Sequence, residues 1–215
     1  MNITLLCSDE QHPINPYLER WMIDARDRHQ VEIVRSKAEA RGGDFLFLIS
    51  CAEIIRAEDR GRYGHTLVLH ASDLPRGRGW SPHIWELTQG AASITVSLLE
   101  AEDKVDTGRI WKKQTVPIAE HALWDEINEA LFSAELALIR YAVEHHREVE
   151  PTTQDPTVEA SYYARRTPDM SRIDPHRSLD EQFDLLRVCD PNRFPAFFEL
   201  RGQRYELTLK KSDDH

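Results

Sequence analysis

A strand–loop–helix signal around His70 constrains the fold of this chain more than any other feature. Residues 67–69 form a short apolar run, Leu-Val-Leu, which is typical of a buried strand of parallel type. His70 ends that run, and a loop rich in Pro and Gly follows it. A helix is then expected, with Ser81 as its N-cap, Pro82 at its first position and Gly90 just past its end. In an open α/β sheet ligands bind where such strands end, so His70 marks a candidate site.

Apolar runs of the same kind recur along the chain and predict the other strands. The apolar run at residues 45–51 is too short for a buried helix and indicates a central strand. Strands are expected at residues 3–8, 31–34, 45–51, 67–70, 94–99 and 109–118, and long helices at 15–29 and 120–150. This alternation predicts an α/β fold with a doubly wound, mainly parallel, Rossmann-like sheet.

The chain is expected to divide after its longest helix. That helix repeats apolar residues at helical spacing, so we interpret it as core or packing surface without a chemical role. Residues 151–156 carry a proline at each end and predict a linker. The expected domains are an α/β domain over residues 1–150 and an extension over residues 151–215 that packs on it.

The extension is expected to contain a helix and a β-hairpin. Ser178 and Glu181 form a capping box, and Leu179 is expected on the inner face of the helix that follows. A turn at Gly202 between two apolar runs predicts the hairpin.

The bulk composition limits the compartment and the partners. No run approaches the ~20 apolar residues of a membrane span, and the N-terminus lacks the pattern of a signal peptide, so we expect a cytoplasmic protein without a membrane partner. A net charge of −10 argues against a nucleic-acid partner. Cys7, Cys51 and Cys189 are far apart and are interpreted as small buried hydrophobic residues, not as a metal site.

A second strand end supplies a possible partner for His70. The run 94–99 leads into an acidic loop that ends in Asp106-Thr-Gly, so two successive strands carry a His and an Asp at their trailing ends. A histidine oriented by a carboxylate is a general acid/base pair. From the residues alone, a His at a strand end is more often a hydrogen-bonded structural residue, and an acidic loop is more often a solvated turn than a site.

These two motifs together resemble a known family. His70-Ala-Ser-Asp-Leu-Pro, three residues, then Gly79-Trp-Ser-Pro, followed by Val105-Asp106-Thr-Gly, resembles the 10-formyltetrahydrofolate-dependent formyltransferases. That group includes methionyl-tRNA, glycinamide ribonucleotide and nucleotide-sugar N-formyltransferases. The resemblance covers roughly residues 45–210 and implies that His70 and Asp106 are catalytic. His70 would stabilise negative charge on the formyl oxygen, while Asp106 would orient His70 and help to remove the amine proton.

The chain departs from the family pattern at Val68. The family has a catalytic Asn two residues before its His, and a valine side chain can neither donate nor accept a hydrogen bond. Three explanations stay open. A neighbour such as Thr66 or Ser97 supplies the polarity, this branch works without it, or the chain is a weakened or non-catalytic relative.

The resemblance also implies where the formyl donor binds. The cosubstrate would be 10-formyltetrahydrofolate, with Ile54, Glu102, Asp103 and Val105 as binding residues and no metal. From the residues alone, Ile54 is equally compatible with the start of a buried helix.

The tail resembles the nucleotide-sugar branch, in which this region helps to hold the sugar nucleotide. The expected substrate-binding residues are Ser8, Arg76, Arg78, Arg166, Arg187 and Phe198. Arg76 and Arg78 fit either an anion site or a solvated turn. Exposed aromatic residues are compatible with a homodimer.

The expected function is formyl transfer to the amine of a nucleotide-linked amino sugar, as in the biosynthesis of surface polysaccharides. The alternatives are transfer to glycinamide ribonucleotide or methionyl-tRNA, and a non-catalytic protein that binds folate or nucleotide. The acidic charge and the early end of the chain weigh against the transfer-RNA branch, which normally carries a further basic domain. An unrelated α/β binding domain is the fourth interpretation.

Overall fold

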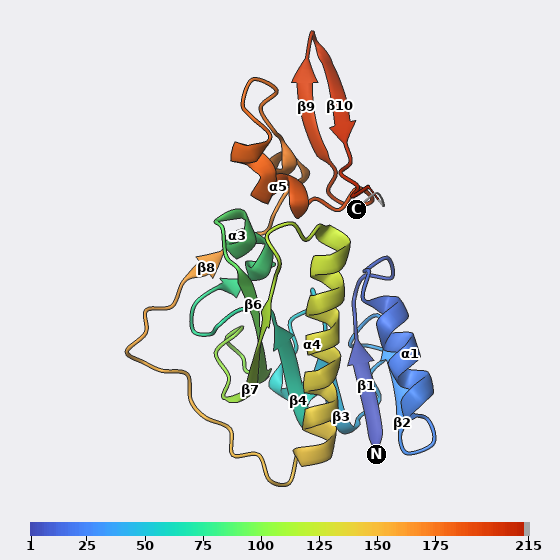
Figure 1. The fold of residues 1–215 in the computed structure, drawn as a ribbon. Coiled ribbons are helices and arrows are strands. Elements are labelled where there is room, and N and C mark those ends of the chain that lie inside the picture. Colours follow the sequence, from blue (N-terminus) through green and yellow to red (C-terminus); the bar gives the residue numbers. More distant parts are fainter. Residues whose placement is uncertain (213–215) are drawn as a thin grey trace.

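A six-stranded sheet lies at the centre of the computed structural model, which describes residues 1–212 (Figure 1). Its strands are β1 (Asn2–Leu6), β2 (Gln30–Val34), β3 (Gly43–Leu48), β4 (Tyr63–His70), β6 (Ser93–Glu100) and β7 (Ile110–Pro117), in the order β2-β1-β3-β4-β6-β7. The first four run parallel, whereas β6 is antiparallel to both β4 and β7. The predicted α/β fold class is confirmed, with a mixed sheet that is mostly parallel.

Two long helices cover one face of this sheet. Helices α1 (Asn15–Ala25) and α4 (Trp124–His145) pack against each other, with α1 next to β2 and α4 next to β6 and β7, and their apolar stripes share one core with the strands (Figure 1). The opposite face has its own apolar cluster, covered by loops and by the short helix α2 (Ala57–Arg60). None of the helices in residues 1–212 is both long and apolar enough to cross a membrane.

Several boundaries differ from the sequence-based expectation. Helix α1 ends at Ala25 instead of continuing to residue 29, and Cys51 lies in a loop beyond the end of β3. Helix α3 (Pro82–Thr88) begins after Ser81 as expected, but Ser81 is left-handed with φ +46° and its side chain caps no backbone N–H. A capping serine needs an extended backbone, because only then does its oxygen reach back to the first turn.

The expected linker packs along the body of the protein. We call residues 151–165 the strap, because they run from the end of α4 past β7 to the loop after β4 (Figure 1). Thr152 forms a bridge with Ile110 of β7. Strand β8 (Tyr162–Tyr163) then pairs in parallel with β5 (Arg78–Gly79). The strap belongs to the predicted extension, and it pairs with two strands, β7 and β5, of the predicted α/β domain.

The extension has a small core of its own. It comprises two 3₁₀ turns, η1 (Pro168–Ser171) and η2 (Asp180–Gln182), helix α5 (Phe183–Arg187) and the hairpin of β9 (Ala196–Leu200) and β10 (Gln203–Leu207). The predicted hairpin is confirmed, and its Arg201-Gly202 turn has positive φ at both residues. Leu179 was expected inside and is 60% exposed, because a 3₁₀ turn precedes α5 and changes which side faces the core. The division into domains at residue 150 stays a prediction.

Candidate active site

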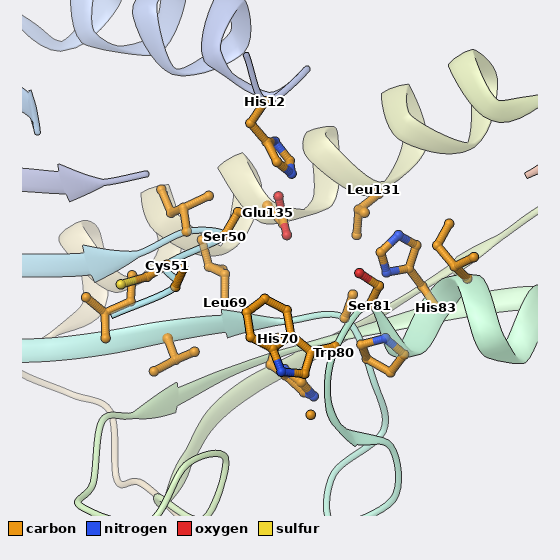
Figure 2. A pocket seen from close by; sticks show the side chains of 18 of the residues that line it. His12, Ser50, Cys51, Leu69, His70, Trp80, Ser81, His83, Leu131 and Glu135 are labelled. Atoms are coloured by element: carbon orange, nitrogen blue, oxygen red, sulfur yellow. The ribbon is translucent and has the colours of Figure 1, made fainter. Parts of the chain in front are cut away.

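A cavity of about 500 Å³ opens beyond the carboxyl ends of β3 and β4. Its lining comes from the loop after β3, the end of β4, the loop into α3, the loop after β6, one face of α4, and residues of the extension. Figure 2 shows His70 and Trp80 on one side, and His12, Glu135 and Leu131 on the other. This is the sheet edge at which ligands bind in open α/β folds.

His70 and Asp106 meet on the wall of this cavity. His70 Nδ1 lies 3.5 Å from Asp106 Oδ1, and both side chains are buried. The other ring nitrogen, Nε2, lies 2.8 Å from the carbonyl oxygen of Gly77. Asp106 Oδ2 accepts a hydrogen bond of 2.9 Å from the N–H of Gly79. Both ring nitrogens of His70 thus face acceptors, and the carboxylate is held by a backbone donor.

The route by which Asp106 reaches His70 differs from the prediction. Strands β4 and β6 are antiparallel, with His70 opposite Ser97 and Leu67 opposite Glu100, so their trailing ends do not lie together. The loop after β6 turns back along β4 instead, and Asp106 adopts a left-handed conformation with φ +59°. The dyad is therefore assembled by a returning loop.

Two glycines allow the loops around the dyad to approach their neighbours. A Cβ on Gly108 would lie only 1.8 Å from the carbonyl oxygen of Glu100. A Cβ on Gly79 would lie 2.4 Å from the carbonyl oxygen of Tyr163, and Gly79 also has φ +96°. Any side chain at either position would displace backbone that holds Asp106.

Val68 has no polar substitute among the two neighbours considered from the sequence. Its side chain lines the cavity and packs against Leu74 and Leu99. The hydroxyl of Ser97 donates 2.7 Å to the carbonyl of Ser72, so it is already engaged. Thr66 Oγ1 is buried without a partner among residues 1–212, but Thr66 does not line the cavity. Of the three explanations left open for Val68, these contacts do not support the one in which Thr66 or Ser97 supplies the polarity, and the other two stay open.

The residues expected to bind the formyl donor all lie on one wall of the cavity: Ile54, Glu102, Asp103 and Val105. Ile54 starts no helix, and its side chain is 56% exposed, as is Val105 at 55%. Lys37 holds this wall, since its Nζ donates 3.0 Å to the carbonyl of Ile54. Two uncovered aliphatic side chains beside carboxylates fit a flat ring that carries N–H donors, as a pterin does. That these residues bind folate stays a prediction.

Only one residue of the expected substrate-binding set lines the cavity, namely Arg166. Arg187 is 3% exposed, pairs with Asp184 at 2.7 Å and donates to the carbonyl of Ala119, so it holds α5 in place and is not available to a ligand. Phe198 stacks on Tyr205 within the hairpin, with ring centroids 5.4 Å apart. Arg187 is therefore corrected to a structural residue, whereas a ligand role for Phe198, which does not line this cavity, stays a prediction.

The other three residues of that set also lie outside the cavity. Ser8 Oγ accepts a hydrogen bond from Ala52 N–H, and Arg78 donates to Gln154 and to the hydroxyl of Tyr162. Arg76 is exposed and borders a second hollow between β7 and the strap. Ser8 and Arg78 therefore have structural partners, and Arg76 points to a different surface.

The cavity contains groups that sequence reasoning missed. The missed residues are His12, His83, Glu135, Arg165 and Arg193. Burial raises the pKa of Glu135 to about 8, lowers that of His83 to about 3 and, with Arg193, lowers that of His12 to about 4. A signal existed for Glu135, because it interrupts the apolar stripe of α4 between Leu131 and Leu138. The interpretation of α4 as packing surface alone is wrong.

Three arginines gather at the side of the cavity formed by the extension. Arg165 lies over the ring of Trp80, with its guanidinium carbon 4.9 Å from the ring centroid, and Arg166 lies over Trp85 at 5.7 Å. Arg193 pairs with Asp9 in the loop after β1. Arginines stacked on aromatic rings keep their N–H groups in place for an anion. Within residues 1–212, no three His, Cys, Asp or Glu side chains are arranged to hold a metal ion.

This fold and site define an α/β enzyme with a His–Asp pair beside a deep cavity. Residues 4–143 match the family described as formyl transferase, and the chain belongs to that family. The protein is therefore a formyltransferase, as the sequence resemblance predicted.

Solved structures show the same fold at low sequence identity. Methionyl-tRNA formyltransferase from Clostridium thermocellum is similar with a TM-score of 0.81 and 20% identity, over 100% of this chain and 95% of that one. A sugar N-formyltransferase from a Shewanella species has a TM-score of 0.73 and 13% identity, over 99% and 98% of the two chains. HypX from Aquifex aeolicus, in complex with tetrahydrofolic acid, has a TM-score of 0.75 and 20% identity, over 96% of this chain and 37% of that one.

The length of this chain is similar to that of solved formyltransferases from two acceptor classes. The chain covers nearly all of a solved methionyl-tRNA formyltransferase and nearly all of a solved sugar N-formyltransferase. Chain length therefore does not separate the two classes, contrary to the expectation from the sequence.

Proposed function

We propose that this protein transfers a formyl group from 10-formyltetrahydrofolate to a primary amine on a nucleotide-linked amino sugar, in the cytoplasm and for the synthesis of a surface polysaccharide. The observation that carries the proposal is the contrast between the two ends of the cavity. One end offers apolar and acidic side chains, the other offers arginines, and His70 and Asp106 lie on the wall between them.

The acidic and apolar wall is where the donor would bind. Ile54 and Val105 would contact the flat ring, while the loop that carries Glu102 and Asp103 would accept its N–H groups. The bound cosubstrate would supply the formyl group that is transferred.

The arginine end is where the acceptor would bind. Arg166 and Arg165 would bind the diphosphate, and Arg193 extends the same positive surface. The exposed Trp80 beside Arg165 offers a surface for a ring. A diphosphate accounts for arginines here better than a small neutral acceptor does, and the net charge of −10 disfavours a transfer RNA.

His70 and Asp106 would perform the proton chemistry. As the amine nitrogen bonds to the formyl carbon, the Nε2–H of His70 would exchange the carbonyl of Gly77 for the formyl oxygen that gains negative charge, while Nδ1 keeps its contact with Asp106. Asp106 keeps His70 oriented and balances the positive ring, and the pair would carry the proton from the amine to the departing nitrogen. The products are the N-formyl sugar and tetrahydrofolate, so no further reactant is needed.

Calorimetry followed by an activity assay tests the proposal. A stable 10-formyltetrahydrofolate analogue is titrated first, and amino-sugar nucleotides carrying uridine, thymidine, guanosine or cytidine are then titrated into the binary complex. Formylation of one of these acceptors is the expected result. Turnover of glycinamide ribonucleotide or methionyl-tRNA alone would reject the acceptor class, and binding without any turnover would favour a non-catalytic relative. Sedimentation of the same sample checks the homodimer, which stays a prediction.

A further inference from the structure

The strap passes the two loops that carry His70 and Asp106 on the side away from the cavity lining. Gln154 of the strap is half-buried and makes hydrogen bonds to both loops. Its Nε2 donates 2.8 Å to the carbonyl of Asp106 and 3.0 Å to the carbonyl of Gly108. Its Oε1 accepts 2.6 Å from Arg78. One side-chain amide therefore uses both of its donors on the Asp106 loop and its acceptor on the His70 loop.

A second contact from the strap holds the His70 loop. Ser161 Oγ accepts 2.8 Å from the N–H of Gly77, whose carbonyl is the partner of His70 Nε2. Pairing of β8 with β5 fixes Gly79, whose N–H donates to Asp106. The protein contacts of both catalytic side chains thus depend on backbone that the strap holds.

We infer that Gln154 is a positioning residue for the His70–Asp106 pair. The inference rests on the proposed formyl transfer and adds a residue outside the cavity to its machinery. Gln154 does not line the cavity, so it acts through Asp106 and not on a ligand.

An amide side chain suits position 154, because it offers two donors to the carbonyls of Asp106 and Gly108 and one acceptor to Arg78. Asp106 is left-handed with φ +59°, a conformation that an Asp adopts at some cost and that needs support from neighbours. Two donors on the carbonyls of Asp106 and Gly108 supply that support. A carboxylate at position 154 would place negative charge against the same two carbonyls, and a shorter side chain would not reach both.

The test compares Gln154→Met, Gln154→Glu and the matched control Thr153→Val. The methionine variant keeps the length of the side chain and removes all three hydrogen bonds. The glutamate variant keeps an acceptor for Arg78 and removes both donors. Thr153 is an exposed neighbour on the strap. The melting temperature of each variant is measured first, and the glutamate variant replaces the methionine variant if the latter fails to fold.

We expect kcat of Gln154→Met to fall by about 10- to 100-fold, because a displacement of about 1 Å at the reacting groups can cost about that much. KM for donor and acceptor should stay within about two-fold, and Thr153→Val should match the wild type. Because Gln154→Glu loses the same two donors, it should fall as far as the methionine variant. A kcat within about two-fold of wild type in both variants, or an equal loss in Thr153→Val, would overturn the inference.

A readout that needs no acceptor separates this inference from the proposed function. The ring N–H protons of His70 are observed by NMR in the wild type and assigned by their loss in His70→Gln. In Gln154→Met the signal of the proton facing Asp106 should shift or exchange away, while it stays in Thr153→Val. If no acceptor is ever formylated, the proposed function fails, yet this signal still decides whether Gln154 holds the pair. An unchanged signal rejects the inference.

Discussion

The His70–Asp106 pair and Glu135 lie on different sides of the cavity and differ in their contacts with the rest of the protein. At the dyad, His70 and Asp106 are surrounded by protein partners, from the carbonyl of Gly77 to the N–H of Gly79. Across the cavity, Glu135 is 8% exposed and receives no hydrogen bond from another residue in the part of the chain that the structure describes. The dyad is therefore held by protein contacts, whereas the Glu135 carboxyl is buried without such contacts among the described residues.

We therefore expect the two sides of the cavity to contribute differently to catalysis and to ligand binding. A catalytic pair fixed by the fold loses little entropy when substrate binds. A buried carboxyl without partners costs stability until something donates to it. Variants on the dyad side should therefore affect turnover, and variants on the other side should affect affinity or stability.

The largest expected effect is on the dyad side. Asp106→Asn should lower kcat by about 10²- to 10⁴-fold, the usual contribution of general acid–base catalysis, because an amide cannot balance the charge of a protonated His70. The side chains have nearly the same shape, so the melting temperature should change little. Activity is measured with the acceptor identified by the binding experiment. A kcat near that of the wild type would remove Asp106 from the mechanism.

The arginine end should respond through affinity. Arg166→Met should raise KM for a nucleotide-sugar acceptor by about 10- to 150-fold and leave KM for the donor unchanged, because a charge-assisted hydrogen bond is worth about 1.5–3 kcal/mol. Steady-state kinetics with each substrate varied in turn measures both constants. An equal rise in both would show that Arg166 does not distinguish the two ends.

Arg187 provides the matched contrast to Arg166. Its guanidinium is buried against Asp184 and the carbonyl of Ala119, so Arg187→Met should lower the free energy of unfolding by about 2–3 kcal/mol through the loss of buried hydrogen bonds. Chemical denaturation measures this change. KM for the acceptor should stay at the wild-type value at temperatures where the variant is folded, and a selective rise in that KM would restore a binding role.

Glu135 should make stability depend on pH. Its folded pKa of about 8 lies above the value of 4.5 for an ordinary Glu, so the folded protein holds this proton more tightly than the unfolded chain does. Its contribution to stability is therefore full below about pH 4.5 and is lost as the pH rises through 8. Glu135→Gln should be close to neutral at pH 4 and stabilising by about 4–5 kcal/mol at pH 8.5, because a shift from 4.5 to about 8 is about 3.5 pKa units at about 1.36 kcal/mol each. A gain of the same size at both pH values would contradict the raised pKa of Glu135.

The strands and the two residues of the dyad could be predicted because each is marked by a pattern in a short stretch of sequence. Short apolar runs mark β1, β3, β4 and β6, and the His70 and Asp106 motifs lie within the chain segments that carry them. What could not be predicted depends on tertiary pairing. The direction of β6 is set by its neighbours in the sheet, and an apolar run does not record it.

The arginines predicted to bind substrate show the same limit. Arg166 and Arg187 look alike in the sequence, yet Arg166 lines the cavity and Arg187 is buried at the end of α5. Their difference depends on how the extension packs on the body. Glu135 was the exception, because a charged residue inside an apolar stripe is a local signal that was available and was not used.

The strap also sets the order in which the site matures during synthesis. His70 and Asp106 leave the ribosome well before Gln154 and Ser161, which lie 48 and 84 residues downstream of Asp106 and Gly77, respectively. A nascent chain can form the central sheet and bring both catalytic residues near each other while the contacts from residues 151–165 are still missing. We therefore expect the His70–Asp106 pair to reach its final geometry only when the strap has emerged and docked, because the strap holds the backbone on which both side chains depend.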